Sequence, residues 1–382
     1  MKKIQLMNKI AKVGTDVFDR NEYEVGDNLV GADAIMVRSA ALHELEFDAN
    51  LKAIARCGAG VNNIPIERCT AAGIVVFNTP GANANGVKEL AVCALLLAAR
   101  NVVGGIDWAK SLEGTEGVAK AVEAGKSKFA GGEIAGKTLG VIGLGAIGGM
   151  VANAANALDM NVIGCDPYLS VDAAWNISKD VKKVATFEEI YKNSDYITLH
   201  VPATPATKNM ICAESIAMMK DGVKIINLSR ADLVNAADIK AALESGKVSA
   251  YVTDFPTEDV VGVPGIIAIP HLGASTAESE DNCAVMAAHE LVDFLENGSI
   301  KNSVNFPNVI VPKTDAARIC VLCASAAAEK VNEAVAAKTE VKNSVTKAKG
   351  DNAYAVIDVA CADGIADELS AIEGVWGVRV IA

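Results

Sequence analysis

The sequence predicts an α/β protein in which two doubly wound, parallel-sheet domains precede a smaller unit of mixed helices and strands. Short apolar runs alternate with helical patterns through residues 1–270, and this alternation is typical of parallel strands joined by helices. The order of elements changes in residues 316–382. A chain of 382 residues is also long enough for two or three domains, at roughly 150 residues each.

The first series of predicted strands lies in residues 1–79. The apolar runs are KIQLM (3–7), DAIMVRS (33–39), LKAIARC (51–57) and GIVVFNT (73–79), each closed by Gly, Asn or Pro. Residues 84–100 form a helical pattern that is apolar on nearly all sides, which predicts a helix buried between layers. Residues 101–137 are punctuated by Gly and rich in Lys and Glu, so we expect a mobile, solvent-facing connection with one or two short helices.

A second series of strands and helices occupies residues 137–270. Helical patterns separate its strands, and a doubly wound sheet binds ligands at the carboxyl ends of such strands. A long helical pattern follows at 277–298, and residues 303–312 form a linker bounded by Pro. The predicted strands are TLGVIG (138–143), NVIGCD (161–166), DYITLHVP (195–202), VKIINLS (223–229), VSAYVTD (248–254) and GIIAIPH (265–271).

The last segment, residues 316–382, is predicted to fold as strand, helix, strand, strand, helix, strand. That order is the ferredoxin-like βαββαβ unit. Cys320 and Cys323 form a CxxC inside its first apolar run, where two buried thiols are expected and no metal site.

The composition is that of a folded, acidic protein. Hydrophobic residues make up 51% of the chain and charged residues 21%, which excludes a disordered or collagen-like chain. Thirty-five basic against 47 acidic residues leave a net charge of −12, so bulk charge will not attract nucleic acid or an anionic membrane. An anionic ligand must therefore be held locally, by a few placed arginines or by helix N-termini.

The nine cysteines are scattered without the spacing of a disulfide framework, which favours a cytoplasmic location. Residues 1–12 contain no apolar run of signal-peptide length. No stretch of about 18 uncharged apolar residues occurs, so we expect no membrane partner.

A glycine-rich loop, GLGAIG at 143–148, follows one predicted strand and opens a helix. In this GxGxxG pattern Gly143 makes the tight turn, Gly145 lets the backbone approach a pyrophosphate, and Gly148 allows close packing of helix on strand. The next strand ends in Asp166, where a carboxylate would accept hydrogen bonds from ribose hydroxyls. A tight turn without a ligand is the alternative, but the context favours a dinucleotide. Asp166 repels a 2′-phosphate and no Arg follows it, so the sequence predicts NAD.

Three polar residues follow later strands: Arg230, Glu258 and His271. Oxidation of a hydroxyl needs a base for its proton, and His suits this near neutral pH. Glu258 would hold the imidazole, and Arg230 would clamp a substrate carboxylate. Singly, each could be a surface or loop residue; together, after strands on the cofactor side, they indicate catalysis.

These motifs resemble the NAD-dependent D-2-hydroxyacid dehydrogenases. The resemblance rests on GLGAIG with Asp166, INLSRADLVN, TDFPTE and PHLGAST, and in the first hundred residues on VRSA, RCGAGVNNI and NTPGANANGVKEL. It implies two Rossmann-like domains, a discontinuous substrate-binding domain of residues 1–98 and 276–312 and an NAD-binding domain of residues 99–275. The C-terminal unit, 316–382, resembles an ACT domain.

The resemblance also implies site residues. His271 would be the acid/base, with Glu258 and Arg230, and Asp254 would hold the nicotinamide carboxamide. Two departures from the family pattern are Ala231 in place of Gly and one residue fewer between Asp254 and Glu258. The implied cofactor-binding residues are Gly143, Gly145, Ala146, Ile147, Gly148, Asp166, Val201, Leu228, Ser229, Asp254, Gly273 and Ala274, and the implied substrate-binding residues are Arg38, Ser39, Arg56, Ala59 and Gly60.

Arg38 and Arg56 would supply the local positive charge that a phosphorylated substrate needs; strand-end arginines paired with surface acids are the alternative. In the ACT-like unit, the loop ASAAAEK lacks the Asn and Pro-Gly of an amino-acid pocket, which argues against serine feedback. Pairing of these units between subunits would be unaffected, so a homodimer or homotetramer is expected.

The activity that the resemblance implies is NAD-dependent oxidation of 3-phospho-D-glycerate to 3-phosphohydroxypyruvate, the first step of serine biosynthesis. The alternatives are a glyoxylate, hydroxypyruvate or other D-2-hydroxyacid reductase, whose smaller substrate does not need both arginines, and a non-catalytic NADH-sensing assembly protein.

Overall fold

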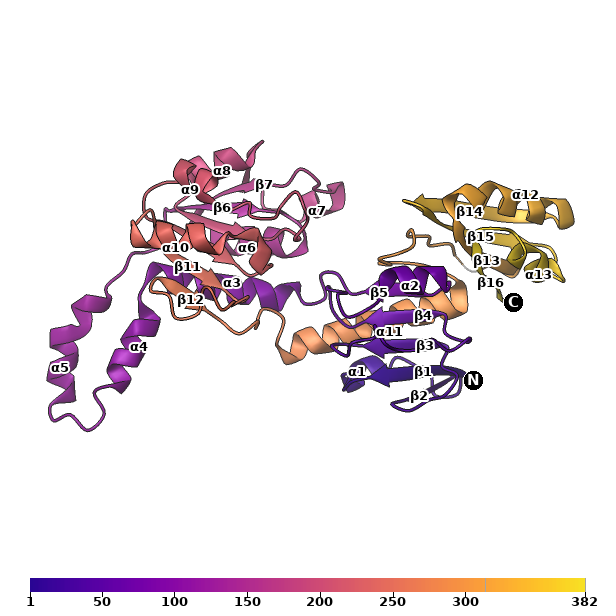
Figure 1. The fold of residues 1–382 in the computed structure, drawn as a ribbon, viewed down its shortest axis with the longest axis horizontal. Helices are drawn as coiled ribbons and strands as arrows, with labels where there is room; N and C mark the ends of the chain where they lie inside the picture. Colours follow the sequence, from indigo (N-terminus) through magenta and orange to yellow (C-terminus); the bar gives the residue numbers. More distant parts are fainter. Residues whose placement is uncertain (313, 382) are drawn as a thin grey trace. The chain divides into compact units, whose positions relative to one another are not determined.

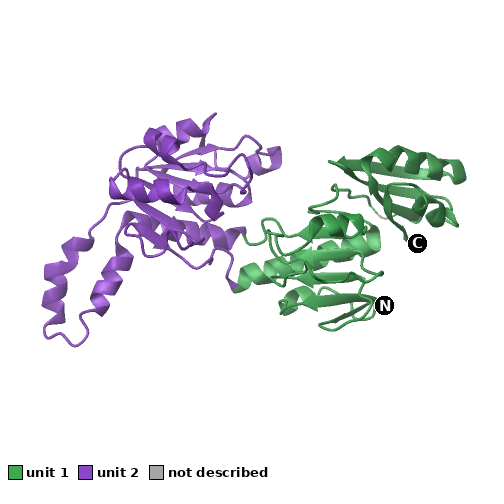
Figure 2. Ribbon diagram, viewed as in Figure 1, with its two compact units in different colours: residues 1–83, 277–382 green, residues 84–276 purple. Residues whose placement is uncertain are grey.

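The chain divides into two compact units (Figure 2). Unit 1 combines Met1–Asn83 with Ala277–Ala382, and unit 2 is Ala84–Thr276. The structure is a computed structural model that describes residues 1–312 and 314–381, so the last residue of the expected C-terminal unit lies outside the described residues. Unit 2 begins at Ala84, whereas the first segment of the substrate-binding domain was expected to end at residue 98. Helix α3 (Ala84–Ala99) falls in unit 2 because its Ala91 and Leu95 lie in the same hydrophobic core as Val141.

Unit 1 contains a five-stranded sheet in the order β2-β1-β3-β4-β5, and all of its strands are parallel. Helix α11 (Ala277–Asn297) packs on this sheet through Ala287, Leu291 and Phe294. The strand at 23–26 was not predicted, because its sequence YEVG is short and half polar. The remaining elements are β1 (Lys2–Met7), α1 (Lys12–Thr15), β2 (Tyr23–Gly26), β3 (Ala34–Val37), β4 (Ala53–Arg56), α2 (Ile66–Ala71) and β5 (Val75–Asn78).

Unit 2 contains a seven-stranded sheet in the order β12-β11-β10-β9-β6-β7-β8, with every strand pair parallel. The order reverses beside β6, and a doubly wound sheet opens its ligand crevice at such a point. The strands are β6 (Thr138–Ile142), β7 (Asn161–Cys165), β8 (Lys182–Lys183), β9 (Tyr196–Leu199), β10 (Val223–Asn227), β11 (Val248–Thr253) and β12 (Ile266–Ala268); the helices on its faces include α6 (Ala146–Ala157), α7 (Val171–Trp175), α8 (Phe187–Asn193), α9 (Ala213–Met218) and α10 (Ala236–Glu244).

Residues 102–129 form a helical arm that projects from unit 2 (Figure 1). It consists of α4 (Val102–Lys110), α5 (Val118–Gly125) and the 3-10 turn η1 (Lys126–Phe129), which agrees with the expected short helices. The rings of Trp108 and Phe129 join its two sides, with centroids 5.2 Å apart. Within the described residues no single helix is long and apolar enough to span a membrane; α3 and α4 together pass that test by length and composition but are bent by 74°.

The C-terminal part of unit 1 is a four-stranded antiparallel sheet in the order β14-β15-β13-β16, with the predicted βαββαβ order. One face is covered by the two helices, and the other shares a core with α11 through Leu322, Tyr354 and Phe294. The fold class is therefore confirmed. The elements are β13 (Ala317–Ala324), η3 (Ser325–Ala327), α12 (Ala328–Lys338), β14 (Val341–Lys349), β15 (Asn352–Val359), α13 (Ile365–Ser370) and β16 (Val375–Ile381).

A buried ion pair fixes the start of this sheet. Arg318 donates to both carboxylate oxygens of Asp358, at 2.7 and 3.0 Å, and both side chains are buried. The same guanidinium donates to the carbonyls of Asn297, Val311 and Pro312. Both buried charges are therefore paired, as a buried ion pair requires. The guanidinium hydrogen bonds to the three carbonyls tie the sheet to the end of α11 and to the linker.

Candidate active site

The glycine-rich loop lies in unit 2 between β6 and α6. Gly143 has a φ of +88°, which glycine adopts without strain. A Cβ on Gly148 would overlap the carbonyl oxygen of Gly143, so only glycine permits this close packing. A Cβ on Gly145 would meet no atom within 4 Å, which leaves space over the loop at the N-terminus of α6. Ala146 and Ile147 open that helix, whose amide groups favour a phosphate.

Asp166 at the end of β7 is hydrogen-bonded to this loop. Its carboxylate accepts the amide of Leu144 at 2.9 Å and that of Tyr168 at 2.8 Å, so it holds the loop while retaining acceptor capacity. Beside it lies a cavity of about 640 Å³, large enough for a nucleoside. Lys179 and Lys183 also line this cavity, although sequence reasoning did not single them out.

His200 lies directly beneath the glycine loop. Its Nε2 is 2.9 Å from the Thr198 hydroxyl, and burial lowers the pKa of the imidazole to about 4. His200 is therefore neutral at physiological pH and serves the packing of the loop. The neighbouring Val201 lies close to Gly143, since a Cβ there would stand 2.9 Å from the valine methyl.

Phe255 brings Arg230 and His271 together. The guanidinium carbon of Arg230 lies 5.4 Å from the centroid of the Phe255 ring, and the imidazole centroid of His271 lies 4.4 Å from it. Both polar side chains are exposed and follow β10 and β12, respectively. Sequence reasoning did not single out Phe255, although an aromatic residue directly after a strand at the ligand edge was a usable signal.

Asp254 lies directly under this pair and is 1% exposed. Its Oδ2 accepts the amide of Gly273 at 3.1 Å, and its carbonyl accepts the amide of His271 at 2.9 Å. Within the described residues, the buried Oδ1 has no hydrogen-bond donor. Burial raises the pKa of the carboxyl group, while the Gly273 hydrogen bond and the charges of His271 and Arg230 oppose that shift. A buried acceptor without a donor suits a ligand amide, so the residues present fit the carboxamide end of a nicotinamide cofactor.

The structure does not bring Glu258 to His271. Glu258 is exposed on the turn in which the amide of Val260 donates to the carbonyl of Thr257, at 3.0 Å. Across residues 1–312 and 314–381 no ion pair within 4.0 Å joins it to the imidazole. Glu258 points toward solvent on this turn, so its assistance to His271 stays a prediction.

The remaining predicted cofactor residues lie at the same edge of the sheet. Leu228 is buried directly after β10, and the Ser229 hydroxyl donates to the carbonyl of Leu199 at 2.7 Å. Gly273 is buried and Ala274 half-buried in the segment after β12.

The predicted substrate residues lie in unit 1, at and after the ends of the adjacent strands β3 and β4. Val37 pairs with Arg56 in the sheet register, so Arg38 and Arg56 emerge as neighbours. Both guanidinium groups lower the pKa of the buried Cys57 thiol, which burial nonetheless raises to about 12. Arg38 also makes an ion pair with Glu280, at 2.6 Å and half exposed, which is the surface pairing weighed as the alternative.

The loop after β4 is held in place from two sides. The guanidinium of Arg56 occupies the space in which a Cβ on Gly58 would stand, and Gly58 has a φ of +145°. The carbonyl of Ala59, next to Gly60, accepts the Asn78 side-chain amide at 2.7 Å. The amide of Ser39 donates to Asn8 at 3.1 Å.

No group of three or more His, Cys, Asp or Glu side chains forms a metal-binding arrangement in the described part of the chain. Cys320 and Cys323 are both buried on β13.

A doubly wound sheet with a phosphate-binding loop, an orphan acceptor at the carboxyl edge of the sheet and an adjacent Arg and His defines the class of nicotinamide-dependent dehydrogenases. Residues 93–273 match the family described as D-isomer specific 2-hydroxyacid dehydrogenase, NAD binding domain. This segment therefore carries the NAD-binding domain of that family, and the predicted family and cofactor are confirmed for residues 93–273.

Relatives of known name agree with this assignment. The chain is 37% identical over 295 residues to D-3-phosphoglycerate dehydrogenase of Methanocaldococcus jannaschii, covering 75% of this chain and 54% of that one. For the enzyme of the same name from Bacillus subtilis the identity is 33% over 301 residues, covering 76% and 55%. The chain thus spans about half the length of the curated relatives it matches.

Among solved structures, the NAD+-bound 3-phosphoglycerate dehydrogenase of Entamoeba histolytica is similar, with a TM-score of 0.62 and 26% identity over 80% of this chain and 98% of that one. A glyoxylate reductase from Paecilomyes thermophila gives a TM-score of 0.64 and 26% identity over 79% and 98%.

Proposed function

We propose that this chain oxidises 3-phospho-D-glycerate to 3-phosphohydroxypyruvate with NAD, the first step of serine biosynthesis. The observation that carries the proposal is the placement of Arg230 and His271 on one aromatic ring, above the orphan carboxylate oxygen of Asp254. The names of the curated relatives support the phosphorylated substrate.

In this proposal each residue has a defined task. Arg230 binds the substrate carboxylate and polarises the oxygen at C2. An imidazole nitrogen of His271 takes the hydroxyl proton as the carbonyl forms, and Glu258 assists when its turn brings the carboxylate inward. NAD, when bound, supplies the acceptor for the hydride that leaves C2. Arg38 and Arg56 bind the phosphate, and Ser39, Ala59 and Gly60 line the loops beside them.

The domain roles follow from the same proposal. Residues 99–275 bind NAD, residues 1–98 and 276–312 bind substrate, and residues 316–382 form the ACT-like unit. We also propose that the protein forms a homodimer or homotetramer. Apolar side chains exposed on the arm support this, namely Val102, Val103, Ile106 and Val118.

A cytoplasmic location is a further part of the proposal. It is supported by the nine cysteines, which are all free thiols.

A second candidate is a reductase of glyoxylate or hydroxypyruvate. The ion pair between Arg38 and Glu280 favours it, because a neutralised Arg38 leaves less charge for a phosphate. The similar structure from Paecilomyes thermophila is that of a glyoxylate reductase.

The direct test of the proposed chemistry is His271→Ala. We expect NADH formation to fall by roughly 10²–10⁴-fold, the usual contribution of a general acid/base. NADH binding, followed by nucleotide fluorescence, should be retained. Turnover close to that of the unmodified protein would contradict the assignment of His271, and full biological effect without turnover would favour an NADH-sensing role.

A further inference from the structure

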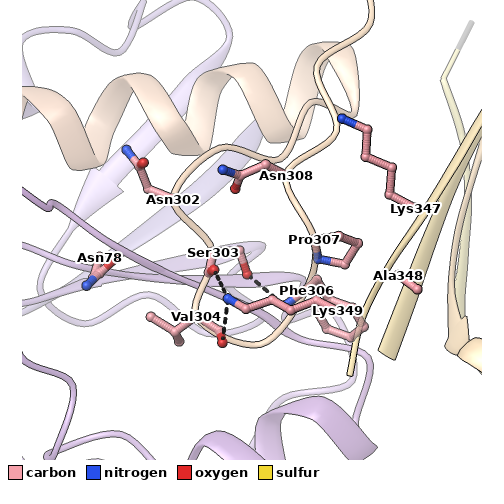
Figure 3. A pocket seen from close by; sticks show the side chains of 10 residues that line it. All are labelled: Asn78, Asn302, Ser303, Val304, Phe306, Pro307, Asn308, Lys347, Ala348 and Lys349. Carbon is pink, nitrogen blue, oxygen red and sulfur yellow. Dashed lines mark hydrogen bonds between the residues drawn. The ribbon is translucent and has the colours of Figure 1, made fainter. Parts of the chain in front are cut away.

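A second cavity lies in unit 1, between the edge strand β14 and the linker segment 302–308 (Figure 3). Its volume is about 580 Å³, enough for a small metabolite. Side-chain amides of Asn302 and Asn308 border it on one side and Lys347 on the other, as Figure 3 shows. None of the residues that line it is acidic.

The walls of this cavity are fixed by hydrogen bonds. Lys349 donates to the carbonyls of Ser303 and Val304, at 2.8 and 3.1 Å. Asn352, the first residue of β15, donates to the carbonyl of Asn305 at 2.8 Å. These contacts hold the strand against the linker, and they leave Lys347 as the cation whose ammonium is available to a ligand, since no carboxylate in the described part of the chain lies within 4.0 Å of it.

We propose that this cavity is a binding site for a small anion that carries a carboxylate or phosphate group. Lys347 supplies the charge, and the Asn308 amide, which makes no side-chain hydrogen bond among the described residues, supplies a donor. Phe306 and Pro307 provide an apolar wall for a short carbon chain. In a protein of net charge −12, a cavity with two lysines and no acid is a selective location for an anion.

The same cavity is connected to the predicted substrate loop. Asn78 lines it and donates to the carbonyl of Ala59 at 2.7 Å. The amide of Asn78 in turn donates to the carbonyl of Asn302 at 3.3 Å. An anion that orders Asn302 and Asn78 therefore changes the position of the loop at Ala59, and we infer an effect on the KM for substrate. This coupling, unlike the binding itself, rests on the proposed function.

The test is calorimetric titration of the full chain with inorganic phosphate and, separately, with acetate; the two probes distinguish the two anion classes. Lys347→Gln and Asn308→Asp are the informative variants, because one removes the cation and the other adds a carboxylate to the cavity. Lys342→Gln and Asn343→Asp are matched controls on the same exposed strand, outside the cavity.

We expect at least one probe to bind, with affinity reduced tenfold or more in Lys347→Gln and Asn308→Asp and unchanged in the controls. The binding site is wrong if neither probe binds, or if both informative variants bind like the controls. The coupling predicts that adding the probe changes the KM of the unmodified protein and leaves the KM of Lys347→Gln unchanged. The coupling is wrong if the probe has the same effect on the KM of both proteins. A protein that binds the probe and oxidises no hydroxy acid would contradict the proposed function alone.

Discussion

The imidazole of His271 packs against the phenyl ring of Phe255 in a tilted arrangement, with ring centroids 4.4 Å apart and planes inclined at 45°. The guanidinium of Arg230 lies over the same ring, so one aromatic side chain sets the separation of the proposed acid/base and the proposed carboxylate clamp. Because both polar side chains are exposed, this ring is a main restraint on them.

Replacement of Phe255 by Ala should lower kcat/KM by roughly ten- to thirtyfold, since an aromatic pair and a cation–π contact each contribute about 1 kcal/mol. Phe255→Tyr keeps the ring and should remain within twofold of the unmodified protein. Steady-state kinetics with parallel NADH titration separate positioning from cofactor binding. A Phe255→Ala variant with unchanged kcat/KM would show that the ring has no positioning role.

Glu258 should matter in turnover although it is exposed on its turn. Glu258→Gln is expected to lower kcat by roughly tenfold to a hundredfold, at the lower end of acid–base effects, because the imidazolium loses its carboxylate partner. Asp259→Asn, on the same exposed turn, is the control and should be neutral. If Glu258→Gln retains full kcat, the assisting carboxylate is Asp254.

The ion pair between Arg38 and Glu280 should compete with a phosphate. Glu280→Gln frees the guanidinium, and because an exposed pair contributes about 0–1 kcal/mol, the KM for 3-phospho-D-glycerate should fall about two- to fivefold. Glu278→Gln on the same helix is the control, as its side chain is exposed. A KM that rises on Glu280→Gln would place Arg38 outside the substrate site.

Glu290 should make unit 1 less stable as the pH rises. It is 5% exposed, and its Oε1 accepts the side-chain amide of Asn302 at 2.7 Å. Burial raises the pKa of Glu290 from 4.5 to about 8, against the opposing effects of the Asn302 hydrogen bond and the charge of Lys301. Below pH 4.5 both folded and unfolded states bind the proton, so stability is highest there with respect to this group. Between pH 4.5 and 8 only the unfolded state ionises, and the stabilising contribution is lost, by roughly 3–5 kcal/mol in total.

Glu290→Gln removes this titration and keeps an acceptor for Asn302. Thermal unfolding at pH 5, 7 and 9 should therefore show the variant gaining on the unmodified protein as the pH rises. Glu278→Gln should follow the unmodified protein at every pH. A constant difference between Glu290→Gln and the unmodified protein over this range would contradict the protonated state of Glu290.

Much of the fold could be predicted from periodicity and loop chemistry. The glycines at 143, 145 and 148 with Asp166 identify the cofactor loop. The local backbone requires glycine at 143 and 148, Gly145 leaves space over the loop, and the acid follows the next strand. The βαββαβ order of the C-terminal part was also predictable from its apolar runs. Strand β2 could not be predicted, because the sequence YEVG has no strand pattern of its own and is extended through its pairing with β1.

The site was only partly predictable, because its contacts join residues that are distant in sequence. Arg230, Phe255 and His271 meet through the parallel order of β10, β11 and β12, which no local pattern encodes. The outward direction of Glu258 depends on one turn. The cavity beside Lys347 depends on contacts between distant segments, since Lys349 and Asn352 donate to the backbone of the linker.

The central claim is most directly tested by NADH formation with 3-phospho-D-glycerate and with D-glycerate, using the unmodified protein and Arg56→Ala. Each charge-assisted contact to a phosphate contributes about 1.5–3 kcal/mol, so kcat/KM should favour the phosphorylated substrate by roughly a hundredfold. Arg56→Ala should remove most of that preference and leave the rate on D-glycerate unchanged. Equal rates on both substrates, or no oxidation of either while glyoxylate is reduced, would contradict the account.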